Sequence, residues 1–109
     1  MSKYLISFPS SSMVVAPEDF AAVGDAAREV VREAKAAGVY VFAGGIHDGV
    51  APVLVHADGS MTAETSHLDG GFCVLELPSR EEGERWAARL ATACRTPQEL
   101  RQFGDDPES

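Results

Sequence analysis

Short runs of aromatic and β-branched residues alternate along the chain with two longer segments in which apolar residues recur at helical spacing. The first run, Lys3 to Phe8, ends at Pro9 and a series of serines, which predicts a strand followed by a turn. Pro17 suits the first position of a helix, and Gly38 suits its end. The residues expected on the buried stripe of this helix are Phe20, Val23, Ala27, Val30, Val31 and Ala34.

Three further strands are expected in the middle of the chain. Val39 to Ala43 form the second strand, and the adjacent Gly44-Gly45 predicts a bulge or a close approach of two backbones. The run Val50 to His56 predicts a third strand, which Pro52 restricts to an edge because proline donates no ladder hydrogen bond. Asp58-Gly59 then predicts a tight turn. The fourth strand is expected from Gly71 to Leu77.

A second helix should follow the fourth strand. Ser79 stands three residues before Glu82, which is the capping-box spacing. Trp86, Leu90 and Ala93 then share one stripe, with Ala87 beside it. The last segment, Gln98 to Phe103, is compatible with a short helix or a strand, and periodicity does not decide between them.

This order predicts an α+β fold: a ferredoxin-like subunit, βαβββα with an expected final strand, whose antiparallel sheet carries both helices on one face. Such a sheet should show polar residues on its open face, yet Phe42 and Phe72 lie among apolar neighbours on strands that are apolar on both sides. Two sheets packed face to face resolve the conflict. We therefore expect a homodimer through the sheet face, forming a dimeric α/β barrel.

Composition limits the number of domains, the classes of partner and the cellular location that we expect. A chain of 109 residues with 45% hydrophobic content predicts a single domain over 1–109, with about 104–109 as a flexible acidic tail. Its formal charge of -8 disfavours nucleic acid and anionic membrane surfaces as partners. No stretch has transmembrane length and the N-terminus lacks signal-peptide features, so a cytoplasmic location is expected. Both cysteines, Cys73 and Cys94, are expected to be buried, reduced thiols.

Several segments, in their order and spacing, resemble the YCII-related family, which includes the DGPF-domain proteins. The similarity extends over nearly the whole chain. The matching segments are Lys3 to Phe8, Val31 to Phe42 running into Gly44-Gly45, Glu64-Thr65, Asp69 to Phe72, Trp86 to Arg89, and Ala93 to Arg95 before Gln98-Glu99.

The resemblance implies a ferredoxin-like subunit in a dimeric α/β barrel, and it favours a strand for Gln98 to Phe103. It also implies that a few relatives act on small aromatic compounds through an Asp/His pair. This chain departs from the family pattern before Glu64, where Asp58 to Ala63 lacks several residues of the usual Asp-Gly-Pro-Phe-like box. His67 also replaces a residue that is more usually acidic.

Candidate chemistry centres on the loop before the fourth strand. His67 and Asp69 are two residues apart, so in an extended segment both side chains leave the same face and present an acid/base pair. In this hypothesis His67 carries the proton and Asp69 or Glu64 orients it. The alternative is that both are solvated loop residues ahead of a glycine turn.

The expected ligand is a small apolar or aromatic molecule in a barrel cleft, with possible lyase-like acid/base chemistry that needs no cofactor. The alternative is a non-catalytic ligand-binding or protein-interaction module that has lost the ancestral site. The histidine spacing gives no metal motif, so no metal is expected. The expected ligand-binding residues are His56, Phe42, Gly44, Gly45 and Phe72.

Overall fold

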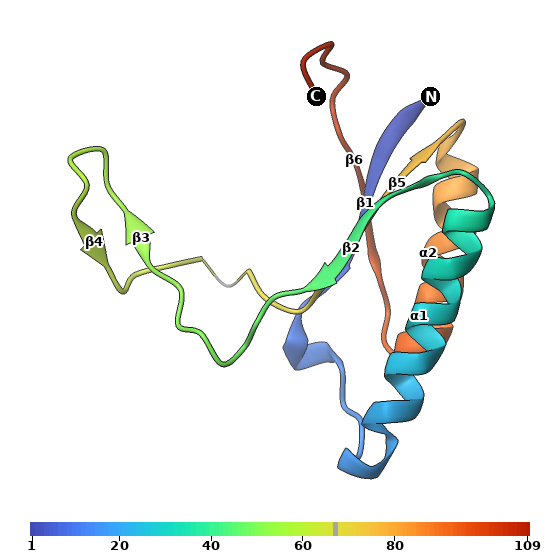
Figure 1. The fold of residues 1–109 in the computed structure, drawn as a ribbon, viewed down its shortest axis with the longest axis horizontal. Helices are drawn as coiled ribbons and strands as arrows, with labels where there is room; N and C mark the ends of the chain where they lie inside the picture. Colours follow the sequence, from blue (N-terminus) through green and yellow to red (C-terminus); the bar gives the residue numbers. More distant parts are fainter. Residues whose placement is uncertain (67) are drawn as a thin grey trace.

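A four-stranded antiparallel sheet with two helices on one face forms the body of the computed structural model, which describes residues 1–66 and 68–109 (Figure 1). The strand order is β2-β5-β1-β6. The fold is thus α+β, as predicted. Its elements are β1 Ser2–Phe8, η1 Ser10–Ser12, η2 Pro17–Asp19, α1 Phe20–Ala36, β2 Tyr40–Gly45, β3 Leu54–Val55, β4 Met61–Thr62, β5 Gly71–Leu77, α2 Arg80–Cys94 and β6 Glu99–Gln102.

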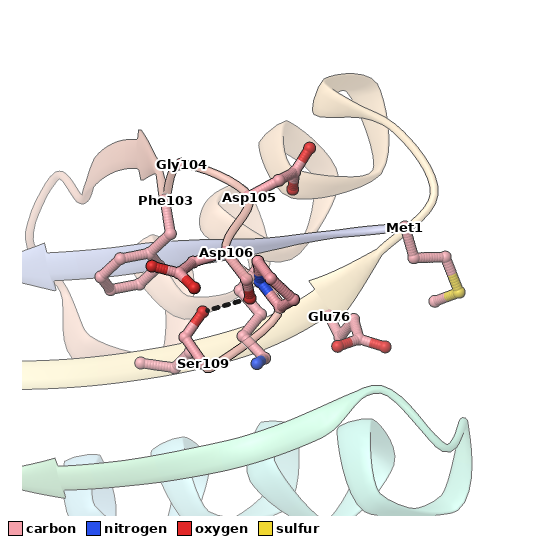
Figure 2. Close-up of a pocket in the computed structure, with 10 residues that line it drawn as sticks. Met1, Glu76, Phe103, Gly104, Asp105, Asp106 and Ser109 are labelled. Carbon is pink, nitrogen blue, oxygen red and sulfur yellow. Dashed lines mark hydrogen bonds between the residues drawn. The ribbon is translucent and has the colours of Figure 1, made fainter.

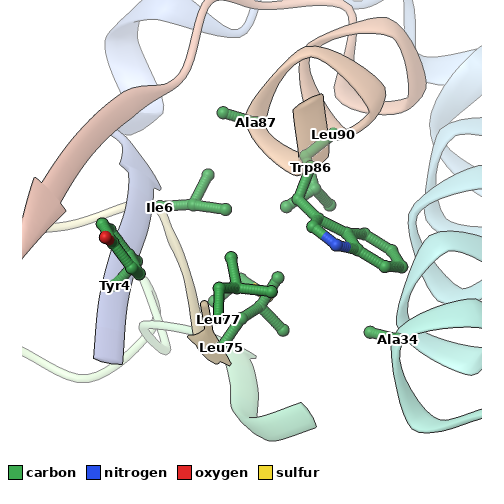
Figure 3. Packing of buried hydrophobic residues seen from close by; sticks show 9 residues of the cluster. Tyr4, Ile6, Ala34, Leu75, Leu77, Trp86, Ala87 and Leu90 are labelled. Atoms are coloured by element: carbon green, nitrogen blue, oxygen red, sulfur yellow. The ribbon is translucent and has the colours of Figure 1, made fainter. Parts of the chain in front are cut away.

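The core lies between the central strands and the two helices. Alternate residues of β1 and β5 point toward the helices, and Ile6, Leu75 and Leu77 are the largest fully buried side chains. Figure 3 shows the Trp86 indole reaching from α2 toward Ala34 of α1. The core cluster consists of Tyr4, Ile6, Ala34, Cys73, Leu75, Leu77, Trp86, Ala87 and Leu90.

The end of α1 and the start of α2 lie where the sequence signals predict, whereas Pro17 begins the short 3-10 helix η2 and α1 starts three residues later, at Phe20. Gly38 adopts a φ of 75°, and the amides of Gly38 and Val39 bond the carbonyls of Lys35 and Ala34. These two bonds form a Schellman motif, which satisfies carbonyls at the end of α1. At the start of α2, the Ser79 hydroxyl accepts a bond of 3.3 Å from the Glu82 amide.

The buried stripes differ slightly from the prediction. In α1, Val23 and Ala34 are buried, but Phe20 remains 58% exposed because it lies at the helix start, away from the core. In α2, Cys94 is fully buried whereas Ala93 is only partly so. Cys94 lies four residues after Leu90, which places it on the same helix face.

The irregularity of β2 lies earlier than the sequence suggested. The register with β5 shifts between Tyr40 and Phe42, before the Gly44-Gly45 pair. Across this bulge Tyr40 and Ala43 both face the core, and Phe42 pairs with Val74 on the opposite face. Side chains therefore do not alternate strictly between the two faces of this strand at the bulge.

The predicted third strand, Val50 to His56, is wrong in length and in pairing. Only Leu54–Val55 is extended and paired, and its partner is β4 in a separate two-stranded sheet. Figure 1 shows this β3–β4 hairpin projecting away from the body. The last strand is confirmed, because β6 pairs antiparallel with β1.

The projecting hairpin makes the molecule wide and thin. Its principal extents are 44 × 43 × 19 Å, and its radius of gyration is 15.5 Å. A compact domain of this length would have a radius of gyration of about 13 Å. The sheet face away from the helices is uncovered, and its apolar residues include Leu5, Phe42, Phe72, Val74 and Phe103.

Candidate functional site

The two glycine pairs of the sequence meet in the sheet, at the end nearest the start of α1. Gly45 of β2 pairs with Gly71 of β5, and the next strand places Phe8 beside Gly71. A Cβ at Gly71 would lie 2.5 Å from the Phe8 ring, so only glycine lets that ring lie across β5. The Phe8 ring therefore covers Gly71 on the helix-facing side, and Gly45 beside it adds no side chain.

A groove of about 690 Å³ occupies this space between α1 and the sheet. Gly45 and Gly71 line its sheet side, and Val23 and Ala27 of α1 lie opposite. A volume of several hundred Å³ with mainly apolar walls is typical of small-molecule sites. The other apolar or aromatic lining residues include Phe8, Met13, Phe20, Val31, Tyr40, Ala43 and Phe72.

Two cationic side chains of α1 also line the groove. The Arg28 guanidinium lies over Gly24 and pairs with Asp25 at 3.2 Å, an ion pair that is largely exposed to solvent. The Lys35 ammonium lies 4.8 Å from the centre of the Tyr40 ring. An apolar groove with cationic groups could hold an apolar molecule that carries an anionic group.

The predicted ligand residues divide among three places. Gly44, Gly45 and Phe72 line the groove. Phe42 lies on the outer sheet face with 57% of its surface exposed, and its ring covers Gly44. His56 lies in the β3–β4 hairpin, where its Nε2 is 3.1 Å from the Thr62 hydroxyl oxygen.

The hairpin that carries His56 closes through a tight turn. The Gly59 amide bonds the His56 carbonyl at 2.9 Å, and the His56 amide bonds the Ser60 carbonyl. Asp58 accepts from the Ser60 amide and hydroxyl, and these bonds lower the pKa of its carboxyl below the usual value. The predicted Asp58-Gly59 turn is confirmed, with Gly59 at a φ of 88°.

Asp69 lies on the other side of the sheet from the groove. It accepts a hydrogen bond of 3.0 Å from the Ser10 amide and another from the Ser10 hydroxyl. It thereby connects the turn after β1 to the segment before β5. Together with Phe72 and Arg101, Asp69 lines a smaller hollow of about 340 Å³ on the outer face.

Glu64, the other described residue of the acid/base hypothesis, is not brought together with the groove. Glu64 is exposed in the loop after β4 and lines none of the three hollows found among residues 1–66 and 68–109. His67 lies outside the described residues, so its pairing with Asp69 stays a prediction.

A third hollow, of about 700 Å³, lies between the end of the chain and the outer sheet face (Figure 2). Its charged lining is mainly acidic, with Glu76, Asp105 and Asp106 against Lys3. The Ser109 hydroxyl bonds the Asp106 carbonyl at 3.0 Å, which folds the tail back on itself. An acidic hollow suits an apolar ligand less well than the groove does.

Both cysteines are buried and free, as predicted. Burial raises the pKa of the Cys73 thiol to about 11, with a smaller contribution from Cys94, and burial also raises the pKa of Cys94. Neither is therefore a thiolate near neutral pH.

Within residues 1–66 and 68–109, no three His, Cys, Asp or Glu side chains come together as metal ligands could. None of the helices described has both the length and the apolar character needed to cross a bilayer.

Sequence reasoning missed the contribution of α1 to the groove. Phe20, Val23 and Ala27 were expected on the core stripe, but the helix-facing sheet surface opposite them carries glycines. Two glycine pairs on strands that face one helix are the signal that could have located the groove. Arg28 carried no recognisable signal of its own.

A scan of the chain against protein-family models finds no match, and a search of curated proteins finds no significant match. The resemblance to the YCII-related family thus stays a prediction based on the motifs of the sequence.

Proposed function

We propose that the protein binds a small apolar or aromatic molecule in the groove between α1 and the sheet. The observation that carries this proposal is the apolar groove of about 690 Å³ along α1, whose sheet side is lined by the paired Gly45 and Gly71. A core that only needed stability would fill such a space with side chains, because interiors are packed closely. Gly45 instead adds no side chain on the sheet side of the groove.

We further propose a ferredoxin-like subunit of the YCII-related type that dimerises through its outer sheet face. The strand order β2-β5-β1-β6, with α1 and α2 on one face, supports the subunit assignment. The outer-face residues Leu5, Phe72 and Val74, which are only partly buried, support the dimer, because complete burial of each side chain would contribute up to about 2 kcal/mol. In this arrangement the groove lies on the side of each sheet away from the partner.

A thermal-shift screen with small aromatic acids and phenols tests groove binding. A ligand that binds only the folded state should raise the melting temperature by about 3 °C or more at saturating concentration. Gly45→Leu should abolish the shift, because the new side chain points into the groove from a backbone outside the left-handed region. Gly104→Leu makes the same change in open space and should leave the shift intact. A shift that survives Gly45→Leu would place the ligand elsewhere.

Light scattering tests the dimer. The wild type should show about twice the chain mass of 11.6 kDa. Val74→Asp should give monomers, because it places a charge at the centre of the outer face. Val14→Asp, at a position 88% exposed outside the sheet, should remain dimeric. A monomeric wild type, or a dimeric Val74→Asp variant, would contradict the proposal.

Acid/base catalysis is the second candidate function, favoured by the position of Asp69 on the outer-face hollow with Phe72. It is tested by incubating the protein with each compound from the screen and following conversion by chromatography. His67→Ala should abolish conversion and leave the fold intact, with Asp69 or Glu64 as the orienting partner. Unchanged conversion would remove His67 from the mechanism. Recovery of every compound unchanged would favour the non-catalytic module.

A further inference from the structure

The charged groups that line the groove all have the same sign. Arg28 and Lys35 are its only ionic side chains among the residues described, and no carboxylate lines it. The whole chain has the opposite bias, with seventeen Asp and Glu against nine Lys and Arg. A purely cationic apolar groove in an acidic protein indicates selection for a negatively charged ligand group.

A glycine inside α1 gives Arg28 its position. Glycine weakens a helix interior relative to alanine, so its presence at Gly24 needs a local reason. Arg28 lies four residues later, and its side chain leans back toward the helix start. A Cβ at Gly24 would lie only 3.2 Å from the Arg28 Nη1. Gly24 thus lets the guanidinium lie closer to the helix, by a few tenths of an ångström, than a larger residue there would allow.

The second cationic side chain of the groove, Lys35, contacts an aromatic ring. Lys35 lies over the Tyr40 ring, 4.8 Å from its centre. It is seven residues from Arg28, which corresponds to about 10 Å along the helix axis. Arg28 is the cation nearer to the start of α1, where Gly24 and Phe20 also line the groove. An anionic group would therefore be held at the Arg28 end.

We propose that the ligand is an aromatic carboxylate, with its carboxylate on Arg28 and its ring between α1 and the glycines of β2 and β5. This inference rests on the proposed function and adds the chemical class of the ligand. A guanidinium has five donors in a planar fork, so Arg28 can bind a carboxylate while it keeps its ion pair with Asp25. The apolar walls supply the remaining contact area.

Calorimetric titration with 2-naphthoate and its neutral counterpart 2-naphthamide, at about pH 7.5 where the acid is ionised, tests the inference. The two compounds share a ring system and differ in charge. Wild type should bind the carboxylate about tenfold more tightly, as expected for one charge-assisted contact. Arg28→Gln should remove this preference, weakening 2-naphthoate binding much more than 2-naphthamide binding.

Two further variants separate a specific contact from general electrostatics. Arg32→Gln removes the same charge one turn later, at a residue that pairs with Glu29 and does not line the groove, so the preference should persist. Asp25→Asn removes the negative charge beside Arg28, which repels the ligand carboxylate, and should raise the 2-naphthoate affinity about threefold.

The outcomes distinguish the inference from the function on which it rests. Equal binding of both compounds by wild type, abolished by Gly45→Leu, would keep the groove and overturn the carboxylate. Loss of preference in Arg32→Gln as well as in Arg28→Gln would also overturn it, because the effect would then be general. Binding of neither compound would contradict both proposals.

Discussion

At the scale of single residues, glycines allow the close approaches between segments and line the groove. Gly70 has a φ of 86°, and a Cβ there would lie 1.9 Å from the Phe8 carbonyl oxygen. Gly71 accommodates the Phe8 ring, Gly45 adds no side chain to the groove, and Gly24 lies beneath the Arg28 guanidinium. The sequence showed two glycine pairs within or beside strands. It did not show that they face each other, because register is set by pairing between distant segments.

Gly70→Ala should destabilise the protein by about 3 kcal/mol or more, because it combines a left-handed backbone with a collision against the Phe8 carbonyl. Gly59→Ala is the matched control, since its φ is 88° but open space surrounds it. It should cost only about 1 kcal/mol. Urea denaturation measures both values. Equal losses would show that the close approach at Gly70 adds nothing.

The raised pKa of the buried Cys73 thiol predicts that the folded protein loses stability at alkaline pH. Its pKa is raised from 9.0 to about 11 by burial, so the unfolded chain loses this proton at lower pH than the folded one. The stability is fully present below about pH 9 and falls as the pH rises to about 11, by roughly 1 to 3 kcal/mol. Cys73→Val should lose less stability over this range in denaturation measured at a series of pH values. Parallel curves for the two proteins would refute this cause.

At the scale of elements, local sequence signals predicted where helices begin and end better than they predicted which strands pair. Gly38 ended α1 through a Schellman motif, and Ser79 began α2, because both depend on contacts within one helical turn. The prediction of the third strand was wrong because Leu54 and Val55 pair only with β4, across their own turn, and are not part of the main sheet. The bulge between Tyr40 and Phe42 had no sequence signal, since it reflects the register with β5.

Ser79→Ala should destabilise the protein by about 1 kcal/mol, because the Glu82 amide at the start of α2 loses its acceptor. The expected fall in melting temperature is about 4 °C. Ser11→Ala removes a hydroxyl from an exposed residue outside the long helices and should change the melting temperature by much less. Comparable falls in the two variants would mean that the cap does not stabilise α2.

At the scale of the whole molecule, the sheet has two faces with different roles in the account. One face holds the core and, where glycines replace larger side chains, the groove. The other face is uncovered and apolar around Leu5 and Val74, and we assign it to a second copy of the chain. The sequence predicted two apolar faces correctly. It did not predict the apolar groove beneath α1.

Backbone amide NMR during titration with 2-naphthoate tests the groove most directly. The glycine amides report on every relevant surface, since Gly24, Gly45 and Gly71 line the groove while Gly59 and Gly104 lie elsewhere. The account predicts saturable shifts at the three groove glycines and none at Gly59 or Gly104. Shifts confined to the outer sheet face or to the β3–β4 hairpin, with Gly24, Gly45 and Gly71 unmoved, would contradict it.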